Sequence, residues 1–237
     1  MSPEVLAHQK DTFFWIIAST YHGHEIYQQI LSSRYAQREN VFLPMYGTLF
    51  ALCGTEYFDC PNVLLEDGEV FADLGVYDGV TSKQVAKMCN YSKIIGFEAN
   101  SYMYEKSKEN LRDLKDIIIY PYAAWDKKEE LKFHIADSGS AITDQGEEVV
   151  LGESLDNILQ GERVTFIKMD IEGAEGKALI GARSTIAKWK PKLAISLYHK
   201  LEDVFEIPSI IMDIRDDYKF YIRHYASVGA GTCLYAY

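Results

Sequence analysis

The stretch that decides the fold is "FADLGVYDGVTS", which covers residues Phe71 to Ser82. An apolar run leads through Asp73 into two glycines, Gly75 and Gly79, and then into a segment that can open a helix. A strand, a glycine-containing turn and a helix are typical of nucleotide-binding sheets. This turn lacks the third glycine of a G-x-G-x-x-G motif and the lysine of a P-loop. The sequence therefore predicts a nucleotide that is bound without a phosphate cradle.

Acidic residues flank the glycines and indicate the charge of that ligand. Asp73 and Asp78 would repel a phosphate, whereas they suit a ligand with an ammonium and a sulfonium group, as in S-adenosylmethionine (SAM). Glu98 follows the next expected strand, 98 − 73 = 25 residues after Asp73, where a carboxylate can accept both ribose hydroxyls. We expect the following residues to bind the cofactor, the last two near its adenine: Asp73, Gly75, Tyr77, Gly79, Glu98, Ala99 and Ala124.

Composition limits the partners and the compartment. The 237 residues carry a formal net charge of −11, which argues against a nucleic-acid partner because such binding needs clustered basic residues. The four cysteines show no CxxC spacing, so we expect reduced thiols in a cytoplasmic protein. The longest early apolar run, residues 13–18, is far shorter than the ~20 residues of a membrane span. We interpret this run as a buried helical segment.

The chain divides into two parts. Residues 1–62 show apolar groups at three- and four-residue spacings and predict an N-terminal helical appendage. From residue 63 to 237, short β-rich runs alternate with helical ones, which indicates an α/β domain with a mostly parallel sheet. Within it, we expect one strand over residues 116–124, one helix over residues 174–190, and a later helix with Pro208 in its first turn. The last two β-rich runs, 219–225 and 232–237, have only a glycine-containing loop between them. They predict an antiparallel hairpin that closes a seven-stranded sheet.

At this point the sequence resembles the FkbM family of SAM-dependent methyltransferases, from about Tyr57 to the C-terminus. The most specific string is "KMDIEGAE" at residues 168–175, and other matching strings are "IIGFEAN", "SLDNIL" and "KPKLAISLYH". The resemblance implies a Rossmann-like methyltransferase sheet of the class I, seven-stranded type. It also implies SAM as methyl donor and a hydroxyl acceptor on a sugar, glycan or natural product.

Four side chains are candidates for catalysis. Asp170 and Glu172 follow one expected strand and His199 ends the next, so all three can reach the carboxyl edge where parallel α/β sheets bind ligands. His224 lies in the first strand of the hairpin and is a further candidate. We expect Asp170 and His199 to orient and deprotonate the acceptor, and Glu172 to bind sugar hydroxyls. Asp170 could also cap the following helix.

Several alternatives stay open. Asp170, Glu172 and His199 could assemble a divalent-metal site, although no ligand spacing demands one, and we predict no metal. An NAD-dependent reductase of a nucleotide sugar would also place Glu98 on a ribose. A third alternative is an interaction module that keeps the fold without catalysis. The N-terminal helices are expected to cap the cleft or to form a homodimer contact.

Overall fold

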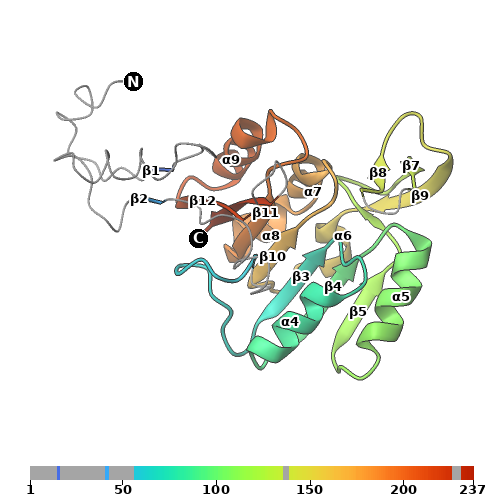
Figure 1. The fold of residues 1–237 in the computed structure, drawn as a ribbon, viewed down its shortest axis with the longest axis horizontal. Helices are drawn as coiled ribbons and strands as arrows, with labels where there is room; N and C mark the ends of the chain where they lie inside the picture. The colour runs from blue at the N-terminus through green and yellow to red at the C-terminus, as the bar shows by residue number, and fades with distance from the viewer. Residues whose placement is uncertain (1–14, 17–40, 43–55, 136–138, 226–230) are drawn as a thin grey trace.

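The computed structural model describes residues 15–16, 41–42, 56–135, 139–225 and 231–237. Its centre is a seven-stranded sheet with helices on its faces, beside which lies a smaller four-stranded sheet (Figure 1). Within the described residues, no helix combines the length and the apolar character that crossing a membrane requires. The predicted α/β class is confirmed.

The first half of the large sheet alternates strands and helices. Its elements are β3 (Val70–Leu74), α4 (Val80–Met88), β4 (Lys93–Phe97), α5 (Ser101–Leu111) and β5 (Ile117–Tyr120). The three strands pair in parallel, because a helix carries the chain back after each strand. Asn100 caps α5 by accepting hydrogen bonds from the backbone N–H groups of Tyr102 and Met103, which ends β4 and begins the helix sharply.

The second half ends in the expected hairpin. Its elements are β10 (Phe166–Met169), α7 (Glu175–Gly181), α8 (Arg183–Trp189), β11 (Lys192–Ser196), α9 (Asp203–Ile214), β12 (Phe220–His224) and β13 (Thr232–Ala236). The strand order is β12-β13-β11-β10-β3-β4-β5. β13 is antiparallel to both of its neighbours, β11 and β12. The predicted seven-stranded sheet with a closing antiparallel hairpin is therefore confirmed.

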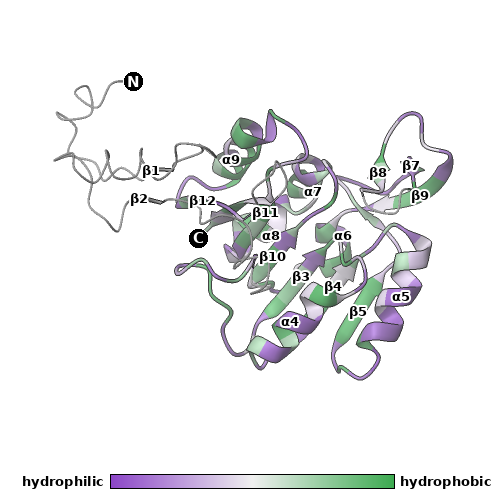
Figure 2. Cartoon of the chain, in the orientation of Figure 1, coloured by the Kyte–Doolittle hydropathy of each residue, from purple (hydrophilic) through white to green (hydrophobic). Residues whose placement is uncertain are grey.

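Both faces of the large sheet are buried in apolar cores. Leu74, Phe97 and Met169 belong to the core under α6 to α9, whereas Phe71 and Phe166 belong to the core on the opposite face. Successive strand residues point to opposite faces, so a strand that is covered on both sides is mostly apolar. Figure 2 shows this as hydrophobic colour along the central strands. The carboxyl edge of the sheet is consequently the part of it that offers polar chemistry.

The second sheet was not predicted as a separate unit. It contains β6 (Ala123–Ala124), β7 (Glu129–His134), β8 (Ala141–Ile142) and β9 (Glu148–Glu153), in the order β6-β9-β7-β8, and is followed by α6 (Leu155–Leu159). The sequence predicted one strand over residues 116–124, but the structure divides it between β5 and β6 in different sheets. Pro121 stands at the division, where a residue without an N–H group interrupts a strand ladder.

A short strand in the N-terminal part replaces a helix that the sequence predicted. β1 (Trp15–Ile16) pairs in parallel with β2 (Val41–Phe42), so the helix predicted over residues 13–18 is wrong at these two positions. Aromatic and β-branched residues favour strands, and a short apolar run cannot be assigned by periodicity alone. The rest of the predicted appendage, up to residue 55, lies outside the described residues.

The single helix predicted over residues 174–190 is two helices. Ala182 leaves helical geometry with φ −109°, and the Asp156 carboxylate accepts hydrogen bonds from the backbone of Ser184 and Thr185 at the start of α8. A side chain from α6 thus satisfies N–H groups that a continuous helix would have bonded internally. The apolar stripe continues through both helices, which is why the sequence pattern did not reveal the break.

The last helix also begins earlier than predicted. Pro208 was expected in the first turn, but α9 begins at Asp203 and contains Pro208 in its interior. Proline lacks the N–H group that its position would donate to the preceding turn. The apolar residues Ile207 and Ile211 of this helix are fully buried, and their burial favours the helix on both sides of the proline.

Candidate functional site

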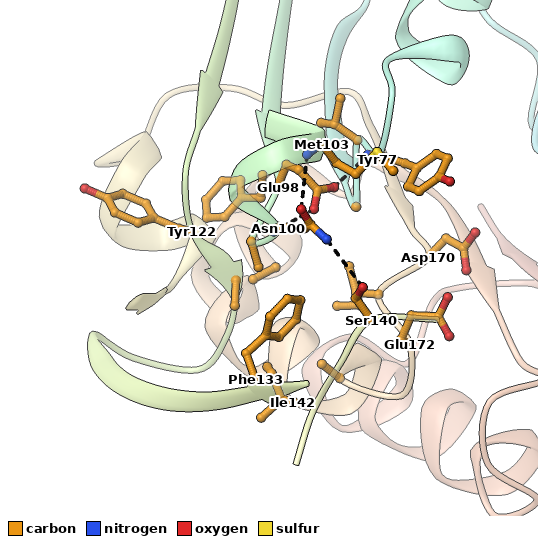
Figure 3. Close-up of a pocket in the computed structure, with 18 of the residues that line it drawn as sticks. Tyr77, Glu98, Asn100, Met103, Tyr122, Phe133, Ser140, Ile142, Asp170 and Glu172 are labelled. Atoms are coloured by element: carbon orange, nitrogen blue, oxygen red, sulfur yellow. Dashed lines mark hydrogen bonds between the residues drawn. The ribbon is translucent and has the colours of Figure 1, made fainter. Parts of the chain in front are cut away.

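A cavity of about 400 Å³ opens at the carboxyl edge of the large sheet. Its walls come from the turn after β3, the segment after β4, the loop after β10 and the small sheet. Figure 3 shows Glu98 on one wall, Tyr122 and Phe133 toward one end, and Asp170 with Glu172 toward the other. The cavity therefore has an apolar end and an acidic end, with a carboxylate between them.

The glycine turn is shaped by close backbone contact. Gly75 lies in the left-handed region with φ +89°, and a Cβ atom there would stand 2.0 Å from the carbonyl oxygen of Asp170. Gly79 has φ +88° and directly precedes α4. Gly75 and Tyr77 line the cavity, whereas Gly79, which was also predicted to bind the cofactor, does not. The turn thus brings backbone, rather than side chains, up to the ligand space.

Glu98 stands at the middle of the cavity with both carboxylate oxygens fixed. Oε2 accepts a hydrogen bond of 2.7 Å from the N–H of Tyr77, and Oε1 accepts one of 2.9 Å from the N–H of Asn100. Burial raises the pKa of Glu98 more than these two bonds lower it. Each carboxylate oxygen can accept a second hydrogen bond, so Glu98 remains able to receive ligand hydroxyls.

Asp73 supports the site from behind the cavity wall. Its carboxylate is fully buried, with Oδ1 3.1 Å from Lys168 Nζ and Oδ2 accepting a 2.7 Å hydrogen bond from Ser82 Oγ. Lys168 also donates a 2.6 Å hydrogen bond to the carbonyl of Gly75. Burial opposes the charge on Lys168, but Asp73 and Asp170 hold its pKa above the usual value. Asp73, which was predicted to bind the cofactor, does not line the cavity.

The apolar lining of the cavity includes both predicted alanines and several residues that sequence reasoning missed. Ala99 and Ala124 line the cavity as expected for an adenine pocket. The additional apolar lining side chains come from α5 and from the small sheet and its connections: Met103, Tyr122, Phe133 and Ile142. Aromatic and aliphatic walls suit a flat heterocycle. Of these residues, Phe133 alone had a signal in the sequence, because it lies on the apolar side of an alternating strand.

At the acidic end, Asp170 is held by two tyrosines. Its Oδ2 accepts a 2.9 Å hydrogen bond from the Tyr57 hydroxyl, and its Oδ1 accepts one of 3.0 Å from the Tyr198 hydroxyl. Burial favours the neutral acid, but Lys168, the two hydroxyls and His199 together hold the pKa of Asp170 below its usual value. The structure thus keeps a charged carboxylate at this end of the cavity. Neither tyrosine was predicted: Tyr57 lies 113 residues from Asp170, and Tyr198, next to His199, carries no local signal of this contact.

His199 lies among three carboxylates. Nδ1 is 2.9 Å from Glu175 Oε1, while Nε2 is 3.3 Å from Glu172 Oε2 and 3.4 Å from Asp170 Oδ1. Burial lowers the pKa of His199, but the three carboxylates raise it by more, so the pKa lies above its usual value. The ligand atoms of Asp170, Glu175 and His199 lie within 4.8 Å of one another, close enough to hold a metal ion. Glu175, which is fully buried, was not among the predicted site residues.

Glu172 and His224 occupy different surroundings. Glu172 lines the cavity from a left-handed backbone position, φ 56°, and burial raises its pKa. His224 ends β12, where its Nδ1 is 2.8 Å from Thr232 Oγ1, and it does not line the cavity. The structure therefore brings Asp170, Glu172 and His199 together but leaves His224 apart. The alternative role of Asp170 as a helix cap finds no support, because Ala174 occupies the N-cap of α7.

The fold and the site define a class of protein. A seven-stranded sheet with one antiparallel inserted strand, and a ligand cavity at its carboxyl edge, is the architecture of Rossmann-like methyltransferases. The profile of the methyltransferase FkbM domain matches residues 69–220, more than half of the chain. The chain therefore belongs to the FkbM methyltransferase family. No curated protein sequence matches it.

Solved structures agree with this assignment. The FkbM methyltransferase of Methylobacillus flagellatus KT is 28% identical with a TM-score of 0.67, over 81% of this chain and 48% of that one. The present chain thus spans about half the length of that protein. Aeropyrum pernix fibrillarin, solved with natively bound SAM, is 12% identical with a TM-score of 0.53, over 79% of this chain and 74% of that one. An rRNA methylase from Streptococcus thermophilus is 12% identical with a TM-score of 0.51, over 81% and 96% respectively. The last two show the fold alone.

Proposed function

We propose that this protein is a SAM-dependent O-methyltransferase that acts on a hydroxyl group of a sugar or a sugar-containing compound. The strongest support is the cavity itself. The buried Glu98 and the carboxylates of Asp170 and Glu172 all line it, in a chain that belongs to the FkbM family. Family membership also favours a methyltransferase over the nucleotide-sugar reductase considered from the sequence. The same carboxylates at the acidic end give a non-catalytic module no support.

The cavity fits SAM in size and in chemistry. Its volume, about 400 Å³, lies in the usual range for small-molecule sites. Glu98 would hold the ribose, the side chains around Ala124 would hold the adenine, and the backbone of Gly75 would face the methionine portion. Asp170 and Glu172 lie on the side away from the adenine end and attract the positive charge of the ligand (Figure 3).

Bound SAM would supply an electrophilic methyl group, and the protein's own residues would position the acceptor. Methyl transfer needs the acceptor oxygen in line with that group at a distance of about 3–3.5 Å. Asp170 is fixed by Tyr57 and Tyr198, so its carboxylate is ready to orient a hydroxyl without further ordering. We propose that Asp170 and His199 orient the hydroxyl and take up its proton, while Glu172 binds neighbouring hydroxyls.

The choice of a polyhydroxylated acceptor follows from the same end of the cavity. Carboxylates accept hydrogen bonds from hydroxyls, and at this end they would repel phosphates and carboxylates on an acceptor. The two carboxylates that line this end, Asp170 and Glu172, can serve adjacent hydroxyls of one sugar. An uncharged polyol is therefore favoured over an anionic acceptor.

The test is a screen of sugars, glycosides and nucleotide sugars with isotope-labelled SAM, read by transfer of the labelled methyl group and by mass. We expect transfer to an oxygen of an uncharged sugar moiety, with S-adenosylhomocysteine (SAH) as the second product. NADH consumption without methyl transfer would contradict the proposal. Transfer to nitrogen or carbon would retain the methyltransferase and reject the hydroxyl acceptor.

A further inference from the structure

The imidazole of His199 is buried in a way that needs a partner. Its side chain is 7% exposed, and within the described residues Nε2 makes no hydrogen bond. Nε2 nevertheless lies close to two carboxylate oxygens, Asp170 Oδ1 and Glu172 Oε2. A buried polar group without a satisfied bond is unfavourable. Nε2 therefore faces a position at which a bound atom could interact with it and with both carboxylates.

The distances around Nε2 match a coordination shell. Nε2 is 3.4 Å from Asp170 Oδ1 and 3.3 Å from Glu172 Oε2. Metal bonds to imidazole nitrogen and carboxylate oxygen are about 2.0–2.2 Å, so two ligands of a tetrahedral ion stand roughly 3.4 Å apart. Nε2 thus stands from each of the two carboxylate oxygens at the separation expected between two ligands of one ion.

Glu175 contacts the ring nitrogen of His199 that faces away from Asp170 and Glu172. Its Oε1 is 2.9 Å from Nδ1 of His199 and also accepts a 3.0 Å hydrogen bond from the N–H of Ile171. Histidines that bind metals usually present their other ring nitrogen to a carboxylate, which fixes the tautomer and the ring orientation. Because Glu175 faces the opposite nitrogen, we assign it this orienting role and not direct coordination.

We propose that His199 Nε2, Asp170 Oδ1 and Glu172 Oε2 bind a divalent cation, with Glu175 orienting the imidazole. One imidazole and two carboxylates form a donor set that suits Mn²⁺ or Zn²⁺. Three carboxylates surround a single imidazole here, and the nearby ammonium of Lys168 is already paired with Asp73. The cluster therefore has negative charge to share with a cation.

The role of the cation rests on the proposed function, whereas its binding does not. The ion would keep coordination positions open toward the cavity, because Asp170 and Glu172 both line it. An acceptor hydroxyl bound there would release its proton to solvent more readily, since a divalent cation stabilises the resulting alkoxide. With the ion bound, His199 Nε2 is a ligand, so the ion takes over the deprotonating role that the free imidazole would otherwise have. Binding measured without any acceptor therefore separates a failure of this inference from a failure of the proposed function.

The experiment is a titration of the metal-stripped full chain with Mn²⁺, followed by electron paramagnetic resonance of the free ion, and with Zn²⁺, followed by calorimetry. We expect one ion per chain. Glu172→Gln and His199→Ala should each weaken binding at least 10-fold, and Glu175→Gln should weaken it about 10- to 100-fold. Glu206→Gln, an exposed change of the same charge on α9, should bind like the wild type.

Folding of every variant is checked by thermal melting. Glu172 is partly exposed, so Glu172→Gln tests the site even if the buried His199→Ala chain does not fold. The proposal is overturned if neither ion binds the wild-type chain stoichiometrically. It is equally overturned if Glu172→Gln binds both ions as tightly as Glu206→Gln does.

Discussion

Lys168 Nζ donates a 2.6 Å hydrogen bond to the carbonyl oxygen of Gly75, which joins the centre of β10 to the turn that follows β3. The same ammonium is 3.1 Å from Asp73 Oδ1, and both side chains are almost completely buried. One lysine therefore fixes the ligand-facing turn and neutralises the carboxylate beneath it. Asp73 therefore supports the turn without lining the cavity.

Replacing Lys168 by methionine should destabilise the protein strongly. The change leaves the Asp73 carboxylate buried without its ion-pair partner, and breaking a buried pair in this way typically costs about 3–5 kcal/mol. Denaturant unfolding measures the loss, with the exposed Lys106→Met as the control. The double variant Lys168→Met/Asp73→Asn should recover part of the lost stability, since it removes the unpaired charge. Equal stability of Lys168→Met and Lys106→Met would show that the pair is not formed.

Gly75 and Gly68 allow the effect of close approach to be separated from that of backbone conformation. Both have left-handed φ values, +89° and +87°, but a Cβ at Gly75 would lie 2.0 Å from a backbone oxygen, whereas at Gly68 the nearest atom is 4.0 Å away. Gly68→Ala should cost about 1–2 kcal/mol from the left-handed conformation alone. Gly75→Ala should cost clearly more and should weaken SAH binding, because Asp170 must move.

Unfolding by denaturant and calorimetry with SAH check this pair of glycines. Gly68→Ala serves as the control because it carries the same conformational strain far from the cavity lining. Equal losses of stability in the two variants, with normal SAH affinity, would contradict the account of the turn.

The sequence predicted those parts of the fold that depend on local pattern. Alternation of β-rich and helical runs located the strands and helices of the large sheet, and the glycine loop before residue 232 located the hairpin. It could not show that residues 116–124 leave one sheet for another, because strand propensity does not specify a pairing partner. It also could not show the break at Ala182, where a carboxylate from another helix caps α8.

The candidate site was likewise predicted only in part. Asp170, Glu172 and His199 were expected together because the carboxyl ends of neighbouring parallel strands share an edge. Tyr57 and Glu175 were missed, since a tyrosine 113 residues away and a glutamate in a helix carry no local signal of their contact with this edge. His224 was included because it also ends a strand, but β13 stands between its strand and β11.

Glu98 should determine the affinity for the cofactor. Glu98→Ala removes the carboxylate that we expect to hold the ribose hydroxyls, and hydrogen bonds to a charged group contribute about 1.5–3 kcal/mol. The expected weakening of SAH binding is therefore about 10- to 150-fold, measured by calorimetry. Glu105→Ala, an exposed glutamate of α5, is the control and should bind normally. Unchanged affinity in Glu98→Ala would remove this residue from the binding site.

His199 and His224 provide a matched test of the reaction end of the cavity. Neither histidine lines the cavity, but His199 lies against the lining carboxylates Asp170 and Glu172, whereas His224, on the edge strand β12, contacts Thr232. General acid–base groups typically contribute 10²- to 10⁴-fold, so His199→Ala should lower kcat by about that factor while SAH affinity stays near normal. His224→Ala should keep kcat within about threefold, because His224 is paired with Thr232 and not with the carboxylates of the cavity. Both are measured by labelled methyl transfer to an acceptor found in the screen. A loss of kcat in His224→Ala as large as in His199→Ala would place the reaction elsewhere along this edge of the sheet.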